Sequence, residues 1–315
     1  MRIWLTVAAL ALAGGASAAP TMVARLNSDS GQVELSEAGR PVLRYVARTI
    51  EPGDLLDRVT EGNRKYTVAR SDYLHPLYGL DGEELTRDWP VDHPHHRGIY
   101  WAWPEVGYKG ELGDLHALQK VFARAAGVPR LTSGAFAEVR AESRWMWDDK
   151  EPIVWETATL RAWPETAAGR FVDLEFALTA LVDGVTLARR GTELYGGLNC
   201  RLNAVTGQQI AFHTDAPEAQ PRMAWADLSG TFPGGQGSAA LTIMPHAGNP
   251  EAPPDWVKYD ELNWFQPTFP QAGHRYALSR EAPTVLRYRL WIRRGGPIDE
   301  AAARAQWTAY HEQEK

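Results

Sequence analysis

Phe171-Val172-Asp173-Leu174-Glu175-Phe176-Ala177-Leu178 is the stretch that decides the fold, because its side chains alternate between two kinds. One face of an extended chain would carry Phe171, Asp173 and Glu175, and the other would carry only apolar side chains. A period of two is that of a β-strand with one buried face. The stretch therefore predicts a half-buried strand of an antiparallel sheet.

The same alternation recurs along the chain, and turn signals such as Asp183-Gly184 and Gly196-Gly197 separate the runs. Strands are expected at 32–36, 41–47, 66–68, 98–103, 118–123, 136–147, 153–163, 171–181, 223–228, 240–244 and 285–292. Only 298–312, which follows Pro297, has a helical pattern. The sequence predicts an all-β protein, a large antiparallel β-sandwich with a short C-terminal helix.

The first residues have the pattern of a secretory signal peptide. Arg2 precedes an apolar run over 3–13, and Ala16-Ser17-Ala18 is a small-residue cleavage signal. We expect a signal peptide over 1–18 and a periplasmic or secreted mature protein. No low-complexity linker interrupts the remainder, so 19–315 is expected to form a single β-sandwich domain.

Composition limits the partners. The 33 basic and 39 acidic side chains give a formal net charge of −6, which argues against a nucleic-acid partner. After the leader no apolar run is long enough to span a bilayer, so membrane insertion is not expected. A small molecule or a glycan is the expected partner.

The segment Asp92-His93-Pro94-His95-His96-Arg97-Gly98 predicts a functional site. It holds three of the nine histidines and precedes the aromatic run 99–103. Imidazole changes its charge near neutral pH and is the commonest metal ligand, so histidines crowded beside an arginine favour a polar site. The alternative is a polar turn whose histidines cap backbone groups.

Other candidates are weighed by their neighbours. His75 lies near Tyr73 and Tyr78, Glu193 precedes a glycine-rich turn, and His213 and His246 each follow a strand-like run. The expected catalytic residues are His75, His93, His95, His96, Arg97, Glu193 and His246, and the expected substrate-binding residues are Tyr78, Asp92, Trp103, Asn199 and His213. In contrast, His116, His274 and His311 are expected at the surface.

A series of motifs resembles the exported PmoA-like family. The motifs are His75-Pro76-Leu77-Tyr78-Gly79, the histidine-rich segment 92–98, Tyr195-Gly196-Gly197-Leu198-Asn199, Ala226-Asp227-Leu228-Ser229-Gly230, Ile243-Met244-Pro245-His246 and Asn249-Pro250. The resemblance implies a β-sandwich of the kind used by galactose mutarotases, with a supersandwich architecture possible. The label "methane oxygenase" often attached to the family does not suit this chain, which lacks the apolar helices of a membrane subunit.

Three functions fit the histidine-rich segment. In the preferred one a histidine and a carboxylate or second histidine perform acid–base catalysis on a carbohydrate, as a lyase, hydrolase or epimerase, and Arg97 stabilises an anionic group. This acid–base function needs no cofactor. In the second, His93, His95 and His246 bind a divalent transition metal. The third is a non-catalytic carbohydrate-binding protein.

Overall fold

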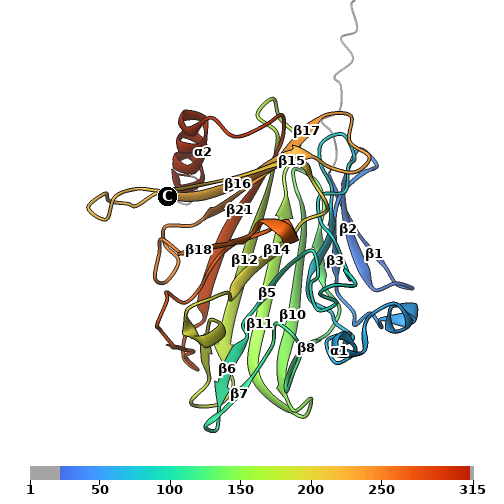
Figure 1. Ribbon diagram of the computed structural model, residues 1–315, viewed down its shortest axis with the longest axis vertical. Helices are drawn as coiled ribbons and strands as arrows, with labels where there is room; N and C mark the ends of the chain where they lie inside the picture. Colours follow the sequence, from blue (N-terminus) through green and yellow to red (C-terminus); the bar gives the residue numbers. More distant parts are fainter. Residues whose placement is uncertain (1–21, 313–315) are drawn as a thin grey trace, which may run out of the picture.

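The computed structural model describes residues 22–312, and the expected signal peptide lies outside these residues. Long antiparallel strands dominate the molecule, as Figure 1 shows. The deciding stretch lies in β12 (Arg170–Ala180), where buried and half-buried side chains alternate without exception. The structure confirms the prediction of an all-β, sandwich-like fold with a short C-terminal helix.

One layer is a nine-stranded sheet with the order β15-β16-β17-β21-β12-β11-β10-β8, in which β9 also pairs with β10. Its strands are β8 (Val121–Ala125), β9 (Arg130–Thr132), β10 (Ala137–Trp147), β11 (Glu151–Ala162), β12, β15 (Thr206–Thr214), β16 (Ala224–Thr231), β17 (Ser238–Pro245) and β21 (Thr284–Arg294).

The other layer is an eight-stranded sheet with the order β1-β2-β3-β4-β5-β14-β19-β18. Its strands are β1 (Met22–Asn27), β2 (Gln32–Glu37), β3 (Arg40–Val46), β4 (Leu74–Leu77), β5 (Ile99–Ala102), β14 (Gly197–Arg201), β19 (Trp264–Pro267) and β18 (Trp256–Tyr259). A four-stranded sheet consists of β6 (Glu105–Tyr108), β7 (Glu111–Gly113), β13 (Thr186–Ala188) and β20 (Tyr276–Ala277).

The hydrophobic core lies between the two large sheets. The Trp101 ring of β5 stacks on the Phe176 ring of β12, with 3.9 Å between centroids. On the neighbouring strands, Cys200 of β14 and Phe265 of β19 are paired and both fully buried. These side chains define the inner face of the eight-stranded sheet.

The alternate residues of the same strands point to the opposite face of the sheet. Tyr100 is opposite Asn199 across β5 and β14, and Arg201 is opposite Trp264 across β14 and β19. Because side chains alternate along a strand, these four lie on the outer face of the eight-stranded sheet. The histidine-rich segment packs on this face.

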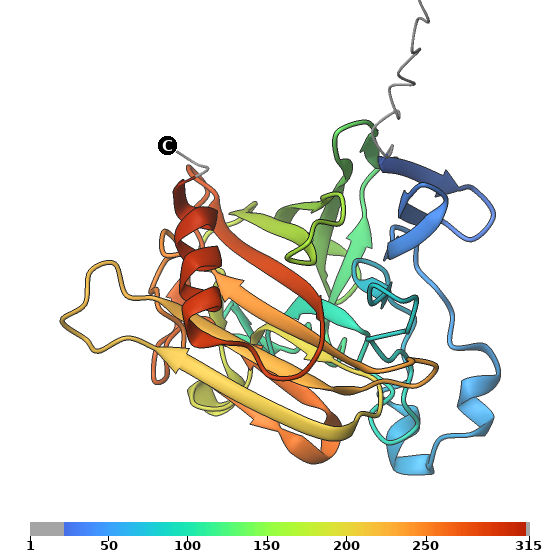
Figure 2. The same cartoon turned by 90° about the horizontal axis from the view of Figure 1, so that it is seen from above.

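Helix α2 (Glu300–Glu312) covers part of the nine-stranded sheet on the side away from the core, as Figure 2 shows from above. Its Trp307 and Tyr310 form a second, small apolar cluster with Trp225, Met244 and Trp291. The short helices elsewhere are η1 (Gly53–Asp57), α1 (Glu61–Arg64), η2 (Arg190–Thr192) and η3 (Asp260–Leu262). No helix among the described residues is long and apolar enough to span a membrane.

One expected strand is wrong. Residues 66–68 follow α1 in irregular backbone, where Tyr66 and Thr67 close the end of the helix through backbone hydrogen bonds to Asn63 and Arg64. Three residues are too few for alternation to distinguish a strand from a turn. The other expected strands are present within a few residues of their predicted bounds.

Two carboxyl groups, those of Asp72 and Glu156, lie together in the interior. Glu156 is 1% exposed and accepts hydrogen bonds from the indole N–H of Trp145, at 2.6 Å, and from Trp101. Asp72 accepts one from the Tyr45 hydroxyl at 2.6 Å. Burial raises the pKa of Glu156 well above its usual value, and the neighbouring Asp72 raises it further. The pair therefore holds a proton in the folded protein.

This proton makes stability depend on pH. A group whose pKa is higher in the folded protein than in the unfolded chain adds to the free energy of unfolding. This stabilisation is complete below the unfolded pKa and is lost as pH rises through the folded pKa. Between these two pKa values we expect the free energy of unfolding of the wild type to fall by up to about 1.4 kcal/mol per pH unit. Glu156→Gln removes the group that takes up the proton, so its free energy of unfolding should fall less steeply. Urea unfolding across a pH series measures it. Glu151→Gln, on the same strand but solvent-accessible, is the matched control, and parallel profiles for Glu156→Gln and wild type would contradict the expectation.

Candidate functional site

The segment 92–98 crosses the outer face of the eight-stranded sheet before entering β5. Gly98, at its end, has a φ of +50°, and a Cβ there would collide with the carbonyl oxygen of Leu74. Its backbone also accepts a hydrogen bond from the Arg201 N–H at 2.8 Å. Glycine therefore lets the segment pass between β4 and β14, which places the preceding histidines on the sheet.

Four histidines form one cluster there. The His96 ring lies 4.8 Å from His93, 4.6 Å from His95 and 5.7 Å from His116, between centroids. It also packs on Trp264 at 4.4 Å. His116 comes from a separate loop and is 1% exposed, so its expected surface position is wrong. We call His93, His95, His96 and His116 the histidine cluster.

The three inner members of the histidine cluster are neutral at physiological pH. Burial lowers the pKa of His95 to about 3 and moves the pKa of His96 and His116 well below the usual value, with neighbouring histidines adding to the effect. Tyr100 and His116 share a hydrogen bond of 2.9 Å at Nε2. In the described part of the chain, Nδ1 of each of these three rings is buried without a hydrogen-bond partner.

His93 is different, because its side chain is 39% exposed and a carboxylate orients it. Its Nδ1 lies 3.1 Å from Oδ2 of Asp92, and the same oxygen accepts a hydrogen bond of 3.0 Å from Nη2 of Arg201. Burial alone raises the pKa of Asp92, but the contacts with His93 and Arg201 lower it more, so that it stays ionised. Asp92 therefore orients His93 and is itself held by an arginine from β14.

Arg97 lies inside the protein, which corrects the expectation that it holds an anionic group of a substrate. Its side chain is 0% exposed, with Nη1 3.3 Å from Oδ1 of Asp88 and Nη2 3.1 Å from the carbonyl oxygen of Val68. The guanidinium also lies over the Trp89 and Tyr73 rings. Burial lowers the pKa of Arg97 to about 10, although the nearby Asp88 carboxylate acts to raise it. These contacts give Arg97 a structural role.

His75, within β4, and Tyr78, directly after it, belong to a different polar group. Nδ1 of His75 lies 3.0 Å from the Thr86 hydroxyl, and its Nε2 lies 3.6 Å from Glu84. Burial lowers the pKa of His75. Tyr78 is half-buried and bridged to Glu84 through the backbone.

His213 and His246 lie on the other layer. His213 stacks on Trp225 at 4.0 Å, and His246 stacks on His311 of α2 at 4.3 Å. Both therefore belong to the outer face of the nine-stranded sheet, and the core separates that face from the histidine cluster. The expected metal ligands His93, His95 and His246 are not assembled. Across residues 22–312 no group of three or more histidine, cysteine or carboxylate side chains is arranged to hold a metal ion.

Trp103 and Asn199 are buried and bonded to the backbone. The Trp103 indole donates to the carbonyl oxygen of Phe269 at 2.7 Å, and the Asn199 amide donates to that of Gly197 at 2.8 Å. Both therefore support strands rather than contact a ligand. Glu193 is exposed, and its carboxylate lies near its neighbour Thr192, at 3.4 Å.

Three half-buried tyrosines surround the histidine cluster, and the sequence did not single them out as site residues. The Tyr66 ring lies 5.2 Å from that of His95, the Tyr195 ring lies 5.0 Å from that of His116, and Tyr259 lies 6.5 Å beyond Tyr195. No local spacing connects these positions, because three separate segments contribute them. Their faces are apolar and their hydroxyls polar, which suits a polyhydroxylated ligand.

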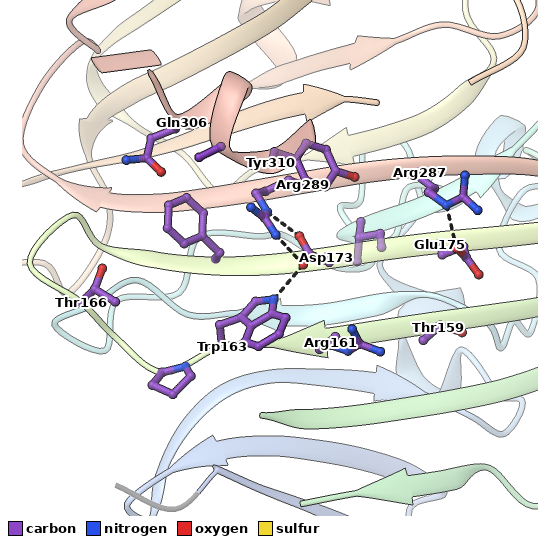
Figure 3. A pocket seen from close by; sticks show the side chains of 14 residues that line it. Thr159, Arg161, Trp163, Thr166, Asp173, Glu175, Arg287, Arg289, Gln306 and Tyr310 are labelled. Carbon is purple, nitrogen blue, oxygen red and sulfur yellow. Dashed lines mark hydrogen bonds and ion pairs between the residues drawn. The ribbon is translucent and has the colours of Figure 1, made fainter. Parts of the chain in front are cut away.

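A cavity of about 660 Å³ lies elsewhere, and none of the four clustered histidines lines it. Figure 3 shows it on the outer face of the nine-stranded sheet. The acid–base groups and the cavity are thus two separate features.

Comparison with known proteins gives a family but no activity. A search of curated proteins found no match. Among solved structures, a candidate kojibiose phosphorylase from the human microbiome matches with 7% identity and a TM-score of 0.35, over 67% of this chain and 24% of that one. A family model, "Family of unknown function (DUF6807)", matches residues 32–308. This match overturns the expected membership of the PmoA-like family. The chain belongs to the family of unknown function DUF6807.

Proposed function

We propose that the protein is a carbohydrate-active enzyme that works by proton transfer at the histidine cluster, with His93 as the general base. The observation that carries the proposal is the chain of contacts from Arg201 through Asp92 to His93, at 3.0 and 3.1 Å. An ionised Asp92 accepts the Nδ1 proton of His93, so Nε2 is left to take a proton from a substrate.

The surroundings support this role. His95 and His96 beside it are neutral, so a proton gained by His93 meets no charged imidazole. Asp92 stabilises the imidazolium that forms. The half-exposed rings of Tyr66 and Tyr195 provide apolar faces and hydroxyls for a sugar.

The arrangement favours epimerase or lyase chemistry over hydrolysis. Hydrolysis of a glycosidic bond usually needs two carboxyl groups on opposite sides of the bond. Asp92 is the carboxylate bonded to the histidine cluster, and it is engaged by both His93 and Arg201. A single oriented base fits removal of a proton from a sugar carbon or hydroxyl.

Activity measurements on substituted proteins test the proposal after a screen of keto-sugars, uronides and neutral glycans. We expect His93→Ala and Asp92→Asn each to lower kcat/KM by about 10²-fold, a common contribution of general base catalysis. The Tm should change little for His93→Ala, because the side chain is partly exposed, but should fall for Asp92→Asn, because the buried Arg201 loses its carboxylate.

His274→Ala is the matched control. His274 is also paired with a carboxylate, that of Glu251, and its side chain is 55% exposed, but it lies outside the histidine cluster. The His274→Ala substitution should leave turnover unchanged. If His93→Ala keeps wild-type turnover, His93 is not the base. If the wild type binds sugars but converts none of them, the protein is a binding protein instead.

A further inference from the structure

The 660 Å³ cavity on the outer face of the nine-stranded sheet is built from three cross-strand rows. One row consists of Arg161, Asp173 and Arg289 on β11, β12 and β21. The next consists of Thr159, Glu175 and Arg287 in the same order. Alternation places all six on one face of the sheet, and α2 closes one side (Figure 3).

The third row is aromatic. Trp163 and Phe171 line the cavity, and the backbone N–H of Trp163 donates a hydrogen bond to the carbonyl oxygen of Phe171. Phe171 is opposite Trp291 across β12 and β21, and the Trp291 ring, which lies outside the lining, stacks on that of Phe171 at 5.7 Å. Tyr310 of α2 adds a further ring to the lining. The cavity therefore has aromatic surface at one end and charged groups along its length.

The charged groups are held in fixed positions. Asp173 accepts hydrogen bonds from Nε of Arg289 at 2.6 Å and from the Trp163 indole at 2.7 Å. Glu175 accepts one from Nε of Arg287 at 2.8 Å. Exposure rises along the cavity, from 6% for the Arg289 side chain to 43% for that of Glu175. Polar groups that are ordered before binding lower the entropic cost of capturing a ligand.

The charge pattern selects the ligand class. Each guanidinium group of the lining is paired with a carboxylate: Arg289 with Asp173, Arg287 with Glu175, and Arg161 with Glu138 outside the lining. The cavity therefore concentrates neither sign of charge. A phosphate or sulfate would meet the carboxylates of Asp173 and Glu175, and an apolar ligand would strip water from both ion pairs. Sugar hydroxyls both donate and accept hydrogen bonds, and the C–H face of a pyranose packs on an aromatic ring.

We propose that this cavity binds a neutral saccharide, with a sugar face against Trp163 and hydroxyls bonded to Glu175, Arg161 and Thr159. A volume of about 660 Å³ falls within the range of roughly 300–1,000 Å³ found for small-molecule sites. This inference rests on the cavity alone and goes beyond the catalytic proposal, because the histidine cluster lies on the other layer.

The test is saccharide binding by the folded full-length protein. An array of neutral, sulfated and uronic-acid oligosaccharides identifies the tightest ligand, and isothermal titration calorimetry then measures Kd. We expect a neutral oligosaccharide to bind, and Trp163→Ala and Glu175→Gln each to weaken it at least tenfold. Trp155→Ala is the matched control, since Trp155 is a half-buried residue of the same strand and sheet face outside the cavity lining.

Further variants ensure that each result either supports or contradicts saccharide binding at the cavity. Thr159→Trp fills the cavity from a half-buried position and should abolish binding even if Trp163→Ala fails to fold. His93→Ala should retain saccharide binding at the cavity, whereas Trp163→Ala should retain turnover of small substrates, so the two proposals fail separately. A charged ligand as the tightest binder, no binding by the wild type, or equal losses for Trp155→Ala and Trp163→Ala each overturn the proposal.

Discussion

Lowering the pH from 6.5 to 5 is expected to destabilise the folded protein by about 2 kcal/mol for each buried histidine of the cluster. The folded pKa of His95 is about 3, and those of His96 and His116 are well below the usual value. A histidine whose pKa is lower in the folded protein than in the unfolded chain stabilises the fold at pH values above the unfolded pKa, near 6.5. This stabilisation is lost as pH falls towards the folded pKa. Together the three contribute about 6 kcal/mol, and the proton held by Asp72 and Glu156 acts in the opposite direction.

Urea unfolding at pH values between 7.5 and 5 measures this loss. His116→Gln keeps a polar group next to the Tyr100 hydroxyl but cannot take up a proton. As pH is lowered, the free energy of unfolding of this variant should therefore fall less steeply than that of the wild type, by about 1.4 kcal/mol per pH unit. His274→Ala, at an exposed position, should follow the wild-type slope. Equal slopes for His116→Gln and wild type would show that His116 is not a buried neutral group.

Arg97→Ala is expected to lower the free energy of unfolding by about 3–5 kcal/mol, because it leaves the Asp88 carboxylate, whose side chain is only 15% exposed, without its cation. For a chain of this size that corresponds to a decrease in Tm on the order of 10 °C. Thermal unfolding followed by circular dichroism measures it. The double variant Arg97→Met, Asp88→Asn removes both charges and should recover part of the loss.

Arg280→Ala provides the comparison for Arg97. Arg280 pairs with Asp183 at 3.2 Å, but their side chains are 54% and 88% exposed, so water screens the pair and Tm should hardly change. If Arg97→Ala instead abolishes turnover and keeps the wild-type Tm, Arg97 belongs to the substrate site and not to the scaffold.

Local alternation predicted most of the long strands of the nine-stranded sheet, because each of them carries its own apolar face, but it missed many shorter strands of the other sheets. It failed where a strand has no such face. In β15 every residue is exposed or half-exposed and none is buried, so the strand carries no apolar stripe to recognise. The strand is held by pairing with β16, which joins residues that are distant in sequence.

The candidate site was predictable only where its residues are neighbours in sequence. The segment 92–98 was found as a unit, but Arg201, which contacts Asp92, lies 109 residues away. His246 does follow a strand, as expected, and His213 lies within one, β15, but alternation along a strand does not reveal which sheet it joins. Both histidines therefore lie on the wrong layer for the expected site.

The unbroken alternation of β12 limits how this chain can change in length. Deleting one residue near its start would reverse both faces, turning Asp173 and Glu175 into the core and Phe176 towards solvent. β12 pairs with β11 on one side and β21 on the other, so neither neighbour could shift to compensate without losing its own register. Insertions and deletions are thus confined to exposed turns such as 127–129, while β12 can vary by substitution alone.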